Sequence, residues 1–103
     1  MADASRKYII QRRHTKLGEY LKKKRLAKGL SQQEVADILG YSSSQFISNF
    51  ECGIYAPPLK KLKTMVHLYD LSVDLLMSII MEEEKRYLKT TLIKKSSRRS
   101  TSA

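Results

Sequence analysis

The sequence predicts an all-α protein in which five helices form a compact domain, followed by a carboxy-terminal helical extension. Apolar residues recur at the three- and four-residue spacing of a helix face, capping side chains precede these stretches, and glycines follow them. The domain is expected at residues 15–81 and the extension at 82–95. Residues 1–14 are expected to be a flexible basic arm and residues 96–103 a disordered tail, because both have few apolar side chains.

The best-marked helix begins at Ser31. Ser31 and Glu34 have the spacing of a capping box, in which each side chain accepts a hydrogen bond from the other residue's backbone amide. Gly40 is expected to end this helix in a left-handed conformation. Its predicted buried side consists of Val35, Ala36, Ile38 and Leu39.

A second short helix is expected at about 43–52, after a tight turn. Ser42 and Ser43 are both suitable caps, and Gly53 is the expected stop. The apolar residues predicted to face inward are Phe46, Ile47 and Phe50. The two helices together have the form of a helix, a turn and a helix.

Three further helices complete the predicted domain. The first, at 15–28, has its apolar stripe at Leu17, Tyr20, Leu21 and Leu26. The fourth, at 58–69, has its stripe at Leu59, Leu62, Met65, Val66 and Tyr69. The fifth begins at Ser72 and is apolar on nearly every side up to Met81, so part of its surface is expected to remain uncovered by its own domain.

The charge of the chain indicates a polyanionic partner, with nucleic acid first and an anionic membrane second. The sequence has 20 Lys and Arg against 10 Asp and Glu, a net charge of +10. No Lys or Arg occurs between Leu30 and Leu59. The second short helix instead presents neutral side chains that can match base edges in a major groove, namely Ser44, Gln45, Ser48 and Asn49. The lysines near the start of the fourth helix are expected to hold the nucleic-acid backbone, namely Lys60, Lys61 and Lys63.

The sequence gives no sign of catalysis, a metal site or a cofactor. His14 and His67 have no second ligand at metal spacing and are expected at the surface. Cys52 lacks the His and Asn or Asp partners of a thiol nucleophile, although redox sensing stays open for it. The longest apolar run is shorter than the ~20 residues that span a bilayer. With no recognisable leader segment, we expect a cytoplasmic, nucleoid-associated protein.

These residues resemble the phage-repressor-like (Cro/CI-type, lambda-repressor-like) helix-turn-helix family between about Leu17 and Leu76. The marks of the resemblance are Ser31-Gln32, Val35-Ala36, Gly40, Ile47-Ser48, Glu51 and Gly53. One extra residue in the turn, within 41–45, departs from the commonest family pattern. The resemblance implies a transcriptional regulator, in many cases a repressor, that binds double-stranded DNA.

The resemblance also implies roles for residues outside the second helix. Arg25 is expected to form an ion pair with Glu51, and Gln32 is expected to contact phosphate and to support Gln45. Gln33 and Ser43 are further candidates for backbone contacts or support of the reading residues.

The carboxy-terminal segment is expected to join two copies of the chain, because one small module buries little surface on DNA. The candidate contact residues are Leu75, Ile79, Tyr87, Leu88 and Leu92. Two alternatives stay open: the segment folds back over its own core, or it binds another protein, as in antitoxins and bridging factors with this fold.

Overall fold

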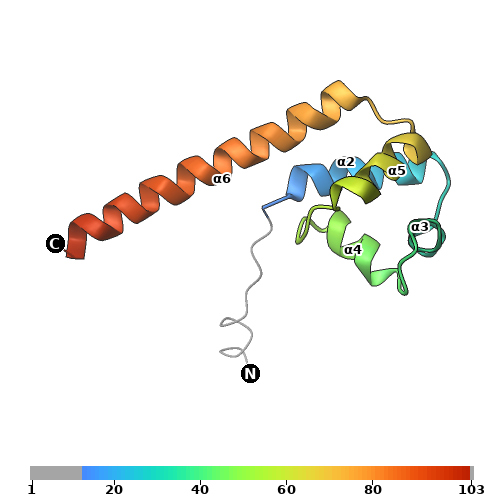
Figure 1. Cartoon of the computed structure of the whole chain (residues 1–103), viewed down its shortest axis with the longest axis horizontal. Helices are drawn as coiled ribbons and strands as arrows, with labels where there is room; N and C mark the ends of the chain where they lie inside the picture. The colour runs from blue at the N-terminus through green and yellow to red at the C-terminus, as the bar shows by residue number, and fades with distance from the viewer. Residues whose placement is uncertain (1–12, 103) are drawn as a thin grey trace.

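The computed structural model describes the backbone of residues 13–102 and the side chains of residues 13–93, so most of the predicted arm lies outside the described residues. The chain forms α2 (Thr15–Ala27), α3 (Gln32–Leu39), α4 (Gln45–Glu51), α5 (Leu59–Tyr69) and α6 (Val73–Ser102). The helices α2 to α5 gather beside the first part of α6, and the far part of α6 projects away from them (Figure 1). The predicted all-α class is confirmed.

Local signals place the ends of α3 as predicted. Ser31 Oγ accepts a hydrogen bond from the Glu34 amide at 3.0 Å, and the Glu34 carboxylate accepts one from the Ser31 amide at 2.8 Å. Gly40 has a φ of 81°, a conformation that residues with a Cβ rarely adopt, and it ends the helix. The capping box and the glycine stop are therefore confirmed.

The core lies where α2, α3, α4, α5 and the start of α6 meet. Its fully buried side chains include Leu17, Leu21, Val35, Ile47, Met65 and Tyr69. Four residues predicted to be buried are exposed instead, namely Leu26, Ile38, Phe46 and Leu59. Each lies at the border of its helix's apolar side or at a helix end, where no neighbouring helix covers it. Leu59, the first residue of α5, is 82% exposed.

The segments predicted as a fifth helix and a helical extension form one continuous helix, α6. No proline or glycine interrupts residues 73–102, and Asp74 in the first turn suits the positive end of the helix dipole. The helix also includes residues 96–102, where the sequence favoured a disordered tail. The boundary expected between Met81 and Glu82 therefore has no counterpart in the backbone.

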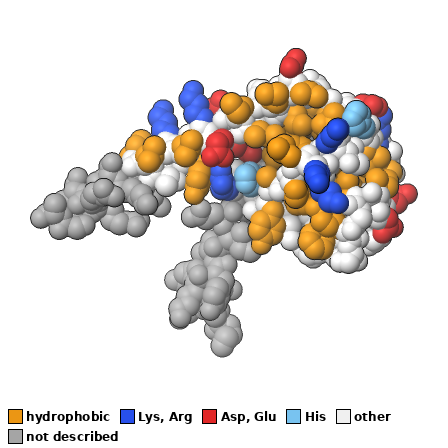
Figure 2. Space-filling view, viewed as in Figure 1, with side chains coloured by type: hydrophobic (Ala, Val, Ile, Leu, Met, Phe, Trp, Pro, Cys, Tyr) orange, Lys and Arg blue, Asp and Glu red, His pale blue; other side chains and the backbone are white. Residues whose placement is uncertain are grey.

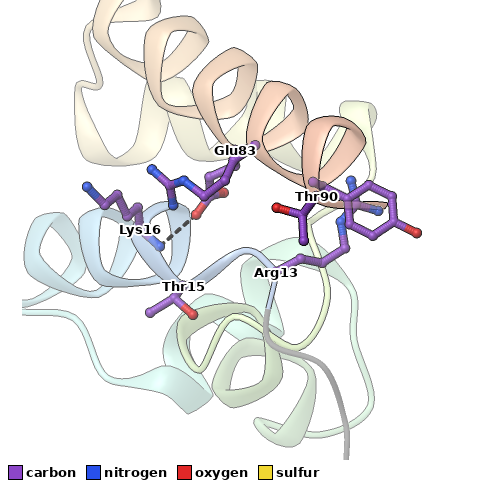
Figure 3. A pocket seen from close by; sticks show the side chains of 7 residues that line it. Arg13, Thr15, Lys16, Glu83 and Thr90 are labelled. Atoms are coloured by element: carbon purple, nitrogen blue, oxygen red, sulfur yellow. Dashed lines mark hydrogen bonds between the residues drawn. The ribbon is translucent and has the colours of Figure 1, made fainter. Parts of the chain in front are cut away.

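Glu83 of α6 caps the beginning of α2. Its Oε2 accepts a hydrogen bond from the backbone amide of Lys16 at 2.7 Å (Figure 3) and another from that of Leu17 at 3.3 Å. The residue in the N-cap position, His14, makes no such side-chain bond. Glu83 is buried, and its carboxylate also complements the positive end of the α2 dipole. This contact ties α6 to the domain well past Met81.

Arg13 and His14 are held in place rather than belonging to a flexible arm. Arg13 binds Glu84 at 2.6 Å, and its guanidinium lies 3.7 Å from the centroid of the Tyr87 ring. The His14 amide donates to the Gly53 carbonyl at 3.1 Å. Burial, followed by the nearby charge of Arg13, lowers the pKa of His14. The surface position predicted for His14 is therefore wrong, whereas His67 is exposed as predicted.

The Glu83 cap predicts a measurable loss of stability on truncation. Glu83→Ala should lower the free energy of unfolding by ~1–3 kcal/mol, because two amides at the start of α2 lose their acceptor. Glu84→Ala is the matched control; it removes a half-exposed ion pair and should cost less than ~1 kcal/mol. Urea unfolding of the three proteins measures both losses. Equal losses for the two variants would contradict a capping role for Glu83.

A buried ion pair joins α2 to α4. Arg25 Nε lies 2.6 Å from Glu51 Oε2, and Arg25 Nη2 donates to Glu51 Oε1 at 3.1 Å. Arg25 Nη1 donates to the Leu30 carbonyl, and Gln32 Nε2 donates to Glu51 Oε1. The hydrogen bond to Glu51 raises the pKa of Arg25. The pair expected from the resemblance is thus present in a bidentate form, with further hydrogen bonds to Leu30 and from Gln32.

The close approach of α2 and α4 explains a glycine inside a helix. A Cβ on Gly18 would lie 2.4 Å from the Glu51 carbonyl oxygen and 2.6 Å from that of Phe50. Any larger residue would push α4 away from α2. The helix contact and the ion pair therefore hold the same end of α4.

Removing one partner of the ion pair should destabilise the domain strongly. Arg25→Met leaves the buried Glu51 carboxylate without its counter-charge and should cost ~3–5 kcal/mol. Lys22→Met, at an exposed position on the same helix, is the control and should change the stability little. Thermal unfolding followed by circular dichroism compares the two. A melting temperature for Arg25→Met close to that of the parent would show that the pair contributes little.

Candidate nucleic-acid interface

The outward side of α4 presents two amide side chains that are hydrogen-bonded to each other. Ile47, Phe50 and Glu51 are buried against the domain, so Gln45 and Asn49 lie on the opposite side. Gln45 Nε2 donates to Asn49 Oδ1 at 2.9 Å, which fits their spacing of four residues. The carbonyl oxygen of Gln45 and the amino group of Asn49 remain as an acceptor and a donor, the groups that an adenine edge requires.

Serines form the turn and the beginning of α4. Ser43 Oγ accepts a hydrogen bond from the Gln45 amide at 2.9 Å, so Ser43 rather than Ser42 supports the start of the helix. The Ser44 carbonyl accepts from the Ser48 amide at 3.0 Å. Ser44 and Ser48 are half-buried beside the more exposed Gln45.

The glutamines of α3 have different partners from those expected. Gln32 Nε2 donates to the charged carboxylate of Glu51. Gln45 Nε2 donates to Asn49 rather than to Gln32, so Asn49 is the side-chain partner of Gln45 in this structure. Gln33 is exposed and donates to Asp37 at 2.9 Å.

The lysines at the start of α5 divide into two kinds. Lys61 Nζ donates to the Leu39 carbonyl at 2.6 Å, which places a cation at the negative end of α3. Lys60 and Lys63 are exposed. The prediction that all three lysines serve an external anion thus overlooked a structural role for Lys61.

Aromatic side chains form an apolar surface beside the amide pair. The rings of Tyr41 and Phe46 are stacked with a centroid distance of 4.5 Å, and Phe50 meets Tyr41 edge-on. A cavity of about 430 Å³ opens here, lined by Tyr41, Phe46, Asn49, Phe50, Tyr55, Ala56 and Pro58. Sequence reasoning placed Phe46 in the core and gave Tyr41 no role. The available signal in the sequence was the presence of Tyr41 and Phe46 at the two ends of the turn that has one extra residue.

The candidate dimerisation residues do not share one surface. Ile79 packs against the core, and Tyr87 lies under Arg13, so both are engaged within their own chain. Leu75, Leu88 and Leu92 are exposed. Figure 2 shows hydrophobic side chains alternating with basic ones along α6.

Four of the exposed apolar residues of α6 form a stripe along one side of the helix, whereas Leu75 and Ile93 lie on another side. Met77, Met81, Leu88 and Leu92, here called the α6 stripe, fall within roughly 60° of the helix surface. A groove of about 210 Å³ between α5 and α6 lies at one end of this stripe, lined by residues that include Leu59, Val73 and Met77.

Other kinds of site have no counterpart in the described part of the chain. Residues 13–93 contain no group of three or more His, Cys, Asp or Glu side chains arranged to hold a metal ion. Among the helices described, none is both long and apolar enough to cross a membrane. Cys52 is exposed.

Comparison with known proteins identifies sequences that are similar to this chain. A stretch of 60 residues is 40% identical to the SPbeta prophage-derived uncharacterized HTH-type transcriptional regulator YonR of Bacillus subtilis (strain 168). The match covers 58% of this chain and 55% of that protein, so the chain spans about half the length of this relative. No solved structure matches the chain. The family model for helix-turn-helix proteins matches residues 21–76, more than half of the chain, and α3, the turn and α4 lie inside the match. The chain therefore belongs to the Cro/CI-type helix-turn-helix family.

Proposed function

We propose that the protein is a transcriptional regulator that binds double-stranded DNA sequence-specifically, with α4 in the major groove. The observation that carries this proposal is the exposed pair of Gln45 and Asn49, whose remaining acceptor and donor match a base edge. The B. subtilis relative is named as a transcriptional regulator, which supports the same function. We place the protein in the cytoplasm, associated with the nucleoid.

The residues around α4 have different roles in this proposal. Gln45 and Asn49 read bases, and the half-buried Ser44 and Ser48 approach the groove wall beside them. Exposed side chains on two flanking helices, Gln33 on α3 and Lys60 and Lys63 on α5, hold the phosphate backbone. Gln32, Ser43 and Lys61 act indirectly, since their hydrogen bonds position α3 and α4.

Selection from random duplex DNA tests the proposal directly. The full chain should enrich one short sequence, and the enriched duplex should bind at least ~10³-fold more tightly than unrelated DNA of the same length. Enrichment of no sequence would exclude base reading by this chain.

The division between base and backbone contacts predicts two different mutant phenotypes. Gln45→Ala should cost ~1–3 kcal/mol on the preferred duplex and leave binding to unrelated DNA nearly unchanged. Lys60→Ala should weaken binding to both duplexes by a similar factor and reduce the salt dependence. Fluorescence anisotropy at two salt concentrations measures all four affinities. An equal loss on both duplexes for Gln45→Ala would show that α4 does not read sequence.

We further propose that two copies associate through the α6 stripe and so reach two half-sites. Half-sites read by a dimer of this kind lie roughly 34–36 Å apart, which requires a two-fold partner. The stripe is an apolar surface of α6 that its own domain leaves uncovered. The competing proposal, a different protein bound to the same stripe, fits the apolar surface equally well and does not require the amide pair.

Polar substitutions in the stripe test self-association without removing the Glu83 cap. Leu88→Gln combined with Leu92→Gln should convert a dimer to a monomer at micromolar concentration and weaken binding to the preferred duplex at least tenfold. Leu26→Gln, at a similarly exposed leucine on α2, is the control. It should change neither the oligomeric state nor the affinity for the preferred duplex. Analytical ultracentrifugation gives the oligomeric state. A parent chain that sediments as a monomer at tens of micromolar would refute the dimer.

A further inference from the structure

The aromatic surface beside α4 has no role in the base and phosphate contacts proposed above. Phe46 is 42% exposed although it is a large apolar residue, and Tyr41 holds its ring in a stack with an interplanar angle of 9°. Tyr55, which also lines the cavity, is exposed as well. An apolar surface kept rigid and open to solvent is typical of a binding site.

The surroundings of this surface indicate which occupant it fits. Asn49 lines the cavity and also accepts the hydrogen bond from Gln45, so the apolar surface continues directly into the amide pair. Lys61 Nζ lies 5.2 Å from the centroid of the Tyr41 ring. An apolar patch bordered by amides on one side and a cation on the other suits a nucleic-acid edge better than an aliphatic protein side chain.

The major groove offers one apolar group at the base edges, the C5-methyl group of thymine. We propose that Phe46, fixed by Tyr41, contacts a thymine methyl group next to the base read by Gln45 and Asn49. This inference rests on the proposed function and adds a specificity-determining residue to it. Phe46 follows Gln45 directly and precedes Asn49 by three residues, so it borders the same side of α4.

Uracil in place of thymine tests the contact, because it removes the methyl group and leaves every hydrogen-bonding atom. Each thymine of the preferred duplex is replaced in turn by deoxyuridine. The parent protein should lose about fourfold in affinity at one or two positions, the effect of burying one methyl-sized group. Phe46→Ala should bind the thymine and uracil duplexes equally at those positions, whereas Leu26→Ala should keep the difference.

The comparison is made within each variant, so a change in the folded fraction cancels in the ratio of the two affinities. Thermal unfolding of Phe46→Ala confirms that the variant is folded at the assay temperature. If the parent binds its preferred duplex equally well with thymine or uracil at every position, this inference is overturned while the proposed function stands. The cavity then has another occupant. A thymine preference that persists in Phe46→Ala also overturns it. Selection that enriches no duplex refutes the proposed function and the inference together.

Discussion

The buried ion pair between Arg25 and Glu51 sets the geometry on which the recognition surface depends. Burial of two charges is tolerable when they are paired and hydrogen-bonded, and here Leu30 and Gln32 supply further partners. Glu51 is the last residue of α4, so the pair fixes the end of this helix against α2. With Ile47 and Phe50 packed in the core, α4 cannot rotate, and Gln45 and Asn49 must face outward.

A second buried carboxylate, that of Glu83, makes the long helix part of the domain. The carboxylate accepts from two amides of α2, and Arg13 adds contacts to the neighbouring Glu84 and to Tyr87 one turn further on. The carboxy-terminal segment thus partly folds back on its own domain, as one alternative held, up to about Tyr87. Beyond this point α6 has no partner within residues 13–93, and its exposed leucines are available to another chain.

Local signals predicted the helices, whereas contacts between residues distant in sequence account for most of the differences between the predicted and the observed structure. The capping box and the glycine stop of α3 depend on neighbours in sequence, and the expected pair of Arg25 and Glu51 came from the family resemblance. Helical spacing identified the apolar side of each helix but not where the neighbouring helix ends, so Leu26 and Leu59 were misplaced. The cap from Glu83 joins residues separated by 67 positions, and no local pattern marks such a contact.

The distribution of charge separates attraction to DNA from choice of sequence. The net charge of +10 draws the chain to any duplex through phosphate, and this term falls as salt rises. The outward side of α4 has no charge, because Glu51, the one ionised residue of the helix, is buried on the opposite side and paired with Arg25. In the proposed function, the reading of bases therefore rests on neutral side chains held in a fixed orientation. A neutral reading surface adds little to non-specific affinity, so its contacts contribute mainly to discrimination between sequences.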